Sequence, residues 1–167
     1  GSVGRQLVEK FALTGQCVRI FDLPQMDFSG LEEDPRIEII KGDATKLHDV
    51  KKAIRDVSSI IHLAAILPPN SERSRDITFR VNVGGTENII RALEETNPNA
   101  TLVFTSSIST YGDTSHEVPP VTISHPQQAI DIYADEMTTY STLSPMINIQ
   151  CPNEEIRAVL GILYDQI

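Results

Sequence analysis

The stretch Val103-Phe104-Thr105-Ser106-Ser107-Ile108-Ser109-Thr110-Tyr111-Gly112 joins a short apolar run to a series of hydroxyl side chains. The apolar run follows a polar linker, so it predicts a short buried strand. Polar groups at the carboxyl end of such a strand lie where open α/β sheets bind their ligands. Serine and threonine are also frequent where loops begin, so this stretch alone does not decide between a site and a turn.

The composition limits the classes of protein to consider. The chain has 167 residues, a net charge of -9 and a sequence pI of about 4.8. This length predicts one domain, and the acidic balance argues against a nucleic-acid partner. We find no secretory signal and no stretch near the roughly 18 apolar residues of a membrane span, so we expect a cytoplasmic protein without membrane contacts. Cys17 and Cys151 form no zinc pattern, so we expect no metal site, and we place Cys17 in the core.

The N-terminal residues have the order of a nucleotide-binding unit. Gly1, Val3 and Gly4 belong to a glycine-containing turn, a helix candidate follows, and the next strand candidate ends at Asp22. Glycines let the backbone approach a pyrophosphate at a helix N-terminus, where free N–H groups favour anions. An acid at the end of the next strand accepts hydrogen bonds from a ribose diol and repels a 2′-phosphate, which favours NAD over NADP.

A strand should precede this glycine turn, and the printed chain has none. Gly1 and Ser2 are alternatively a remnant of a cloning vector. A sheet that lacks its first strand would be empty at its centre. We therefore expect that residues are missing before Gly1.

Strand candidates over residues 36–40, 58–66 and 101–104 alternate with helix candidates over residues 50–57 and 76–96. When the missing strand is counted, this alternation predicts an α/β fold with a Rossmann-type, doubly wound parallel sheet. The crossovers between its strands should be right-handed.

Two polar residues near the strand ends each allow two interpretations. Asp43 either contacts an adenine amino group or starts a turn. His62 lies in an apolar strand, where a lone histidine is more often structural than catalytic. Ala64 and Ala65 follow it, and small residues at this edge permit the close approach of a cofactor.

Several motifs occur together in one order: Gly1-x-x-Gly4, Asp22, Gly42-Asp43-Ala44, His62-Leu63-Ala64-Ala65, Asn82-Val83-Gly84-Gly85-Thr86-Glu87-Asn88, and Thr105-Ser106-Ser107 with Tyr111-Gly112. Over about residues 1–135 the chain thereby resembles the extended short-chain dehydrogenase/reductase family, also called the NAD-dependent epimerase/dehydratase family. The resemblance implies NAD as the cofactor, a small-molecule substrate such as a nucleotide sugar, and homodimers formed through two helices. It implies cofactor contacts by Gly1, Val3, Gly4, Asp22, Asp43, Ala44, Leu63, Ala64, Ala65, Asn82 and Thr105.

The resemblance also implies two catalytic residues. By position, Ser107 would hydrogen-bond the substrate oxygen. A Tyr-x-x-x-Lys motif follows in the family, and Tyr133 stands at the distance of its tyrosine, the general acid/base. The lysine of that motif favours the deprotonated tyrosine, because a free phenol, with a pKa near 10, is a poor base at neutral pH.

The chain departs from the family at this lysine. The residue four positions after Tyr133 is Met137, and the last lysine of the chain is Lys52. Three explanations remain: a natural non-catalytic relative, an engineered fragment, or residues missing from the printed chain near Tyr133. We favour the third, because residues 138–145 predict a poor helix. An intact mass equal to the 18.5 kDa of the printed chain would contradict it.

The C-terminal residues predict a strand over 146–150 and a helix from about residue 152 to residue 163. We divide the chain into an NAD-binding domain over residues 1–135 and a remnant of the C-terminal substrate-binding lobe over residues 136–167. Most of that lobe is absent from the printed chain, since a full family member has well over 100 further residues.

The sequence thus predicts an NAD-dependent epimerase, dehydratase or dehydrogenase. It would transfer hydride between nicotinamide and a hydroxyl or keto substrate, with Ser107 and Tyr133 as catalytic residues. The alternative is a non-catalytic relative that binds NAD and acts as a sensor or scaffold. Met137 in place of the lysine favours this alternative.

Overall fold

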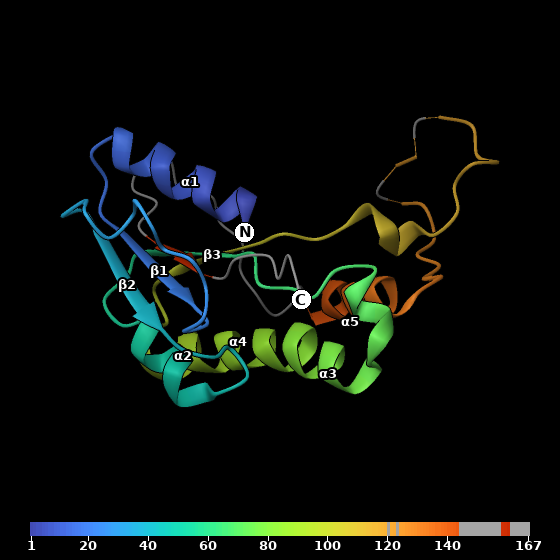
Figure 1. Cartoon of the computed structure of the whole chain (residues 1–167). Coiled ribbons are helices and arrows are strands. Elements are labelled where there is room, and N and C mark those ends of the chain that lie inside the picture. The colour runs from blue at the N-terminus through green and yellow to red at the C-terminus, as the bar shows by residue number, and fades with distance from the viewer. Residues whose placement is uncertain (120, 123, 144–157, 161–167) are drawn as a thin grey trace.

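The computed structural model describes residues 1–119, 121–122, 124–143 and 158–160. Its strands form one parallel sheet in the order β2-β1-β5-β3-β4 (Figure 1). The strands are β1 Val18–Asp22, β2 Ile37–Lys41, β3 Ser59–His62, β4 Thr101–Phe104 and β5 Ala158–Leu160. The helices are α1 Ser2–Leu13, α2 Leu47–Ala53, α3 Arg75–Phe79, α4 Gly85–Thr96 and α5 Ile132–Leu143, with shorter turns η1 Asn70–Arg73, η2 Arg80–Gly84 and η3 Ile108–Tyr111.

Helices cover both faces of the sheet: α1 lies on one face, and α2 and α4 lie on the other (Figure 1). The alternation of side chains along β1 divides the core accordingly. Val18 and Ile20 pack in the cluster that contains Val8 of α1, whereas Phe21 packs with Ile54 and Leu93 beside α2 and α4. The parallel α/β architecture expected from the alternating pattern is therefore confirmed.

The centre of the sheet holds β5. Backbone pairing joins Ile20 of β1 to Val159, and Ile61 of β3 to the same residue, all in parallel register. The helix expected over residues 152–163 is therefore wrong for residues 158–160. The facing edges of β1 and β3 carry backbone N–H and C=O groups that need partners, and a strand satisfies them where a helix cannot.

The two segments predicted from the sequence, residues 1–135 and 136–167, are joined in the structure by one helix and one sheet. Helix α5 crosses the division between residues 135 and 136, and β5 pairs within the sheet. The division therefore does not follow an element boundary. The strand expected over residues 146–150 lies outside the described residues.

Helix α5 continues to Leu143, although residues 138–145 predict a poor helix. Thr138 donates its hydroxyl to the carbonyl oxygen of Ala134 at 2.9 Å, and Thr139 donates to that of Asp135 at 3.0 Å. Such contacts with the preceding turn let threonine sit in a helix without leaving its hydroxyl unpaired.

The helical segment expected over residues 76–96 contains a π-helical turn. Along the chain, helix α3 is followed by the π-helical turn η2 and then by helix α4. Such turns are rare and frequently lie at functional sites. The turn carries Asn82, which faces the cavity described below. Beyond it Gly85 packs on Ala44, so that an added Cβ would lie 3.5 Å from the Ala44 Cβ.

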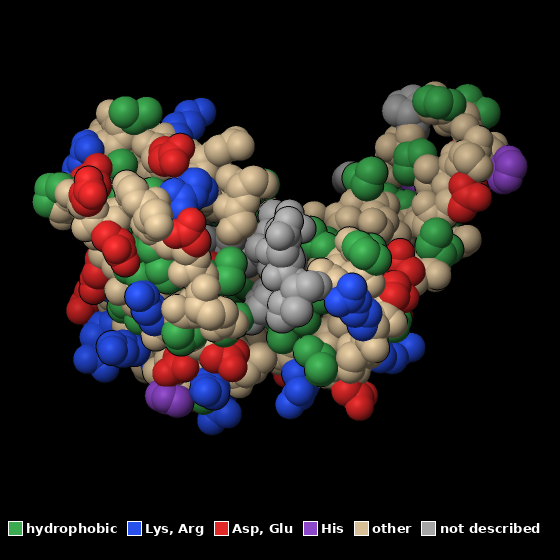
Figure 2. All heavy atoms as spheres, viewed as in Figure 1, with side chains coloured by type: hydrophobic (Ala, Val, Ile, Leu, Met, Phe, Trp, Pro, Cys, Tyr) green, Lys and Arg blue, Asp and Glu red, His purple; other side chains and the backbone are tan. Residues whose placement is uncertain are grey.

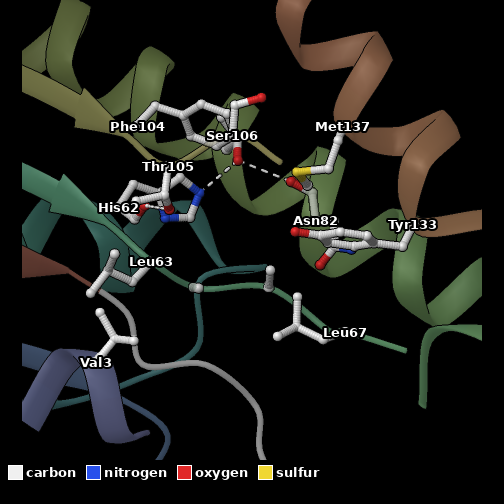
Figure 3. Close-up of a pocket in the computed structure, with 13 residues that line it drawn as sticks. Val3, His62, Leu63, Leu67, Asn82, Phe104, Thr105, Ser106, Tyr133 and Met137 are labelled. Carbon is white, nitrogen blue, oxygen red and sulfur yellow. Dashed lines mark hydrogen bonds between the residues drawn. The ribbon is translucent and has the colours of Figure 1, made fainter. Parts of the chain in front are cut away.

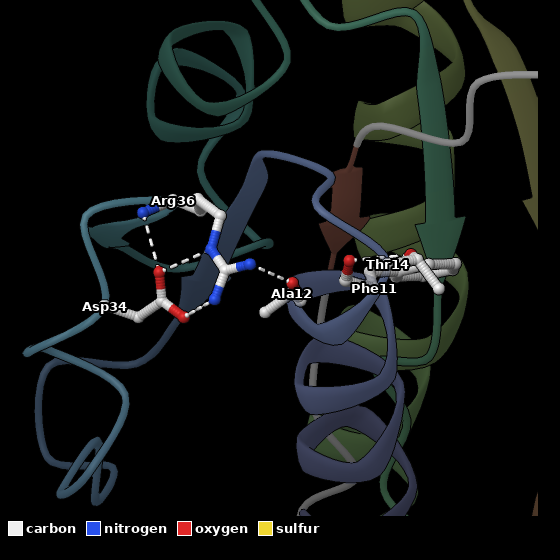
Figure 4. Close-up of polar contacts among 5 residues, drawn as sticks. All are labelled: Phe11, Ala12, Thr14, Asp34 and Arg36. Carbon is white, nitrogen blue, oxygen red and sulfur yellow. Dashed lines mark hydrogen bonds and ion pairs between the residues drawn. The ribbon is translucent and has the colours of Figure 1, made fainter.

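The loop before β2 is fastened to the end of α1 by Arg36 (Figure 4). Arg36 donates from Nη1 to the carbonyl oxygen of Ala12, which also accepts from the backbone N–H of Gly15 at 3.0 Å. Its other guanidinium nitrogens donate to both carboxylate oxygens of Asp34, at 2.9 and 2.7 Å. Thr14 adds a second cap by donating to the carbonyl oxygen of Phe11 at 2.8 Å.

The surface carries charges of both signs. Figure 2 shows Lys and Arg side chains interspersed with Asp and Glu over the face in view. The segment after η3 extends away from the body (Figure 1). It exposes apolar side chains, among them Val118. Cys17 is exposed, so its expected place in the core is wrong. No helix within the described ranges is long and apolar enough to span a membrane.

Candidate cofactor and active site

A cavity of about 200 Å³ opens at the carboxyl ends of β3 and β4 (Figure 3). This volume is below the roughly 300–1,000 Å³ of a complete ligand pocket, so the cavity suits one end of an extended ligand. The structure brings together in its wall several residues expected there from the sequence: Val3, Leu63, Ala64, Ala65, Asn82, Thr105 and Tyr133.

Other expected residues lie outside the cavity wall. Asp22 ends β1, Gly1 and Gly4 lie at the start of α1, and Asp43 and Ala44 follow β2. These positions are all at the same edge of the sheet, because the carboxyl ends of parallel strands share one edge. An extended ligand that runs along this edge passes all of them.

Asp22 is the most unusual carboxylate at this edge. Its side chain is 7% exposed, and its Oδ1 accepts a hydrogen bond from the backbone N–H of Leu23 at 2.7 Å. Its Oδ2 is buried and has no partner among the described residues. Burial raises the pKa of Asp22 to about 6. A buried acceptor without a donor is costly, so this oxygen is suited to a ligand hydroxyl.

The N-terminus of α1 lies beside this acid. Gly1 occupies the N-cap position, and no side chain caps the helix there. The first turn of α1 contains no acidic residue, and Gly4 within it is buried. The backbone N–H groups of a helix N-terminus and the helix dipole favour an anion at this end, in agreement with the expectation from the glycine turn.

Asp43 has the turn-forming role that the sequence allowed. Its Oδ1 accepts hydrogen bonds from the backbone N–H and the hydroxyl of Thr45, at 2.9 and 2.8 Å. The carbonyl oxygen of Ala44 accepts from the Asn88 side chain at 2.9 Å, which ties the loop after β2 to α4. Contact between Asp43 and adenine stays a prediction.

His62 lines the cavity and joins β3 to α4 through a buried hydrogen bond. Thr86 donates its single hydroxyl hydrogen to the carbonyl oxygen of Asn82 at 2.9 Å, so His62 Nε2 donates to Thr86 at 2.6 Å (Figure 3). The side chain is 1% exposed, and burial lowers the pKa of His62 to about 4. His62 is therefore neutral near pH 7 and serves to connect β3 with α4.

The hydroxyl residues after β4 point in different directions. Ser107 accepts from the backbone N–H of Ser109 at 3.2 Å and donates to the Ser109 hydroxyl at 3.0 Å, which caps η3. Ser106 lines the cavity, and Thr105 donates to the carbonyl oxygen of His62 at 2.9 Å. The catalytic role expected for Ser107 is neither confirmed nor contradicted by these contacts.

Tyr133 and Met137 line the cavity from α5, one helical turn apart (Figure 3). Met137 is 2% exposed and packs with Val83, against the half-buried rings of Phe104 and Tyr133. The wall of the cavity, as far as the structure describes it, contains no Lys or Arg. The position four residues after Tyr133 is therefore apolar, and no Lys or Arg side chain of the described cavity wall accompanies the phenol.

Sequence reasoning missed part of this wall. Thr86 and Ser106 stand inside quoted motifs, yet their contacts depend on which way each side chain points. Leu67 and Phe104 are apolar and carry no chemical signal of their own. They line the cavity because β3 and β4 end beside it.

The profile of the 3-beta hydroxysteroid dehydrogenase/isomerase family matches residues 1–142. The chain belongs to this family. It lies within the extended short-chain dehydrogenase/reductase superfamily, so the resemblance seen in the sequence is confirmed. The members of this superfamily are NAD-dependent dehydrogenases and epimerases.

Within the aligned segments, curated relatives are identical to this chain at about a third of the positions. The bovine sterol-4-alpha-carboxylate 3-dehydrogenase (decarboxylating) is 32% identical over 109 residues, which are 65% of this chain and 28% of the bovine protein. A 3 beta-hydroxysteroid dehydrogenase/Delta 5→4-isomerase of Mycobacterium tuberculosis is 34% identical over 114 residues, covering 65% of this chain and 30% of that protein. The chain thus spans less than a third of the length of these relatives.

Solved structures share the fold. A short-chain dehydrogenase/reductase superfamily protein from Agrobacterium tumefaciens with bound NAD is 27% identical, with a TM-score of 0.74 over 96% of this chain and 46% of that one. A Bordetella bronchiseptica enzyme in complex with NAD and UDP superposes with a TM-score of 0.76 at 18% identity, over 96% of this chain and 49% of that one. At that lower identity the likeness concerns the fold alone.

Proposed function

We propose that this chain is the NAD-binding part of an oxidoreductase that transfers hydride between nicotinamide and a secondary hydroxyl or keto group. The observation that carries the proposal is the buried, unpartnered oxygen of Asp22 at the end of β1. It lies at the sheet edge that also holds the N-terminus of α1. A ribose diol supplies the missing donors, and a 2′-phosphate in the same place would be repelled.

The residues present fit the adenosine ribose and the pyrophosphate of such a cofactor. Asp22 would hold the adenosine ribose, and Gly1 and Gly4 would face the pyrophosphate. Ala64 and Ala65 lack bulk where the cavity wall must allow close approach. NAD, when bound, supplies the hydride acceptor.

Tyr133 is the cavity residue suited to proton transfer, since its hydroxyl is both a donor and an acceptor. Ser107 would polarise the substrate oxygen. For that role its hydroxyl must exchange the contact with Ser109 for one with the substrate. In the proposed reaction the substrate C–H bond would break with its electron pair as hydride, which NAD would accept. The substrate O–H proton would pass to Tyr133 in its phenolate form, leaving a keto group and a neutral phenol.

A hydroxysteroid is the substrate class that we propose to test first. The curated relatives above, which are more than 30% identical, are named as sterol and steroid dehydrogenases. A nucleotide sugar is the second class. It is supported only by the names and bound ligands of structural neighbours such as UDP-glucose 4-epimerase, which is 16% identical.

A second function is favoured by one observation, the apolar surroundings of Met137. Without a cation beside Tyr133, the chain would bind NAD without turnover and act as a sensor or scaffold. Both functions share the cofactor site and differ only in chemistry.

A titration with NAD, combined with a hydride-transfer assay on hydroxysteroids and UDP-glucose, separates the possibilities. Binding together with reduction of NAD by a hydroxyl substrate is the expected result. Binding without hydride transfer to or from either substrate class would favour the sensor or scaffold. Absence of NAD binding would contradict both functions.

A further inference from the structure

Glu136 is a buried acid that the proposed chemistry does not use. Its side chain is 2% exposed on α5, between Asp135, which is exposed, and Met137, which lines the cavity. Its Oε2 accepts a hydrogen bond from Asn82 Nδ2 at 2.7 Å. Its Oε1 is buried without a partner among the described residues. Burying a carboxyl group with only one hydrogen-bond partner is unfavourable, so its presence here needs a functional or structural explanation.

Its partner Asn82 joins three elements. Asn82 Oδ1 accepts from the backbone N–H of Ile66 at 2.7 Å, and Nδ2 donates to the carbonyl oxygen of Ile66 at 3.1 Å. The second Nδ2 hydrogen goes to Glu136. Asn82 is 1% exposed, and both its amide oxygen and its amide nitrogen have hydrogen-bond partners. Loss of the Glu136 carboxyl group would leave one buried N–H of Asn82 without an acceptor.

These contacts lie directly behind the cavity wall. Ile66 stands between Ala65 and Leu67, which line one side, and Glu136 stands one helical turn from Tyr133, which lines the other. Asn82 itself lines the cavity between them (Figure 3). The distance between the two walls therefore depends on a chain of three side-chain hydrogen bonds.

We propose that Glu136 is a positioning residue of this cavity: through Asn82 it holds α5, with Tyr133 and Met137, against the segment that follows β3. The inference rests on the proposed function only in regarding the cavity as part of the cofactor site. The contact itself joins residues 54 positions apart and is independent of any ligand.

The charge of Glu136 makes the contact sensitive to pH. Burial raises its pKa to about 7, and the carboxylates of Asp135 and of Glu72 on η1 add to this shift. The amide of Asn82 on η2 and the guanidinium of Arg75 on α3 oppose it. Helix α5 also packs against η3, which carries no carboxylate or cation. The ionised carboxylate is a stronger acceptor than the protonated group. The hydrogen bond from Asn82 to Glu136 should therefore strengthen as the pH rises through about 7.

The test follows the Asn82 side-chain amide and the Tyr133 ring by NMR from pH 5.5 to pH 8.5, on the whole chain without ligand. We expect both sets of signals to shift together with a midpoint near pH 7. The shift should vanish in Glu136→Gln, which keeps an acceptor but does not titrate. It should persist in the control Asp135→Asn, which alters the exposed neighbour that pairs with Arg75.

Signals of Asn82 and Tyr133 that stay constant with pH, or a shift that persists unchanged in Glu136→Gln, would overturn the proposal. If the Gln variant does not fold, the wild-type titration decides by itself, through the presence or absence of the coupled shift. A residue with only a structural role would lower the melting temperature without this coupled titration. Failure of NAD to bind would refute the proposed function and leave the outcome of this titration intact.

Discussion

At the scale of single residues, Met137 decides how much chemistry the cavity can perform. A lysine at this position would place an ammonium group one helical turn from Tyr133, where it favours the phenolate. We predict that Met137→Lys raises hydride transfer about 100-fold, which is within the range of general acid–base catalysis. Steady-state turnover with saturating NAD is the measurement.

The control for this substitution is Met137→Leu, which keeps the position apolar and should leave turnover unchanged. The Lys variant should also melt at a lower temperature than the Leu variant, because it buries a cation beside Val83 and Phe104. Equal turnover in the two variants, with NAD bound in both, would contradict the role given to this position.

Asp22 should make cofactor binding depend on pH. Its raised pKa of about 6 means that the folded chain without cofactor keeps this carboxyl group protonated in mild acid. Ribose hydroxyls donate to the carboxylate, so NAD should bind the ionised form. We expect affinity about tenfold weaker at pH 5 than at pH 8, with the change centred near pH 6. Calorimetric titration measures this profile, and Asp22→Asn should bind weakly with no step at pH 6.

At the scale of elements, the Asp34–Arg36 pair links the β1–β2 connection to the end of α1. The hydrogen bonds from Arg36 lower the pKa of Asp34 to about 2. A lowered carboxyl pKa contributes stability that is present above about pH 4 and is lost as the pH falls towards 2. We therefore predict that Asp34→Asn unfolds more easily than wild type at pH 7 and that the difference shrinks below about pH 4 and disappears as the pH falls through about 2.

Urea unfolding across this pH range tests the prediction. Glu9→Gln is a matched control, because Glu9 is an exposed acid on α1 itself. A stability difference between Asp34→Asn and wild type that stays constant down to pH 2 would show that the pair does not titrate as proposed.

Two glycines should respond in opposite directions to substitution by alanine. Gly112 has φ +70°, and an added Cβ would lie 2.1 Å from the carbonyl oxygen of Gln128. Gly112→Ala should therefore cost at least about 1–3 kcal/mol. Gly84 has helical angles (φ -62°, ψ -34°) and open space around an added Cβ, so Gly84→Ala should stabilise by about 0.5–1 kcal/mol. Equilibrium unfolding in urea compares the two variants, and the same sign for both would refute the predicted contrast.

At the scale of the whole molecule, the order of elements follows from local patterns. Apolar runs bounded by turn residues marked β1 to β4, and helical spacing marked α1, α2 and α4. The edge at which we propose NAD to bind was predictable because the carboxyl ends of parallel strands meet at one edge. The position of Asp22 at the end of a strand candidate is enough to predict its place at this edge, whereas its burial and its unpaired oxygen depend on packing.

The features that were not predictable depend on contacts between distant residues. The place of β5 depends on backbone groups of β1 and β3, which no pattern within residues 152–163 reveals. The contact between Glu136 and Asn82 has no sequence signal either, since an acid on a helix is usually exposed. Ser107 is intermediate between predictable and unpredictable features. Its hydroxyl bonds the backbone N–H of Ser109, two residues later, and serine commonly makes such local turn contacts.

We propose above all that the carboxyl edge of the sheet is an NAD site anchored at Asp22. Calorimetric titration of the chain with NAD and with NADP at pH 8 tests it most directly, in wild type and in Asp22→Asn. We predict that wild type binds NAD at least about tenfold more tightly than NADP, and that Asp22→Asn loses most of this preference by weakening NAD binding. Equal binding of the two cofactors by wild type, or a preference that survives in Asp22→Asn, would contradict the account.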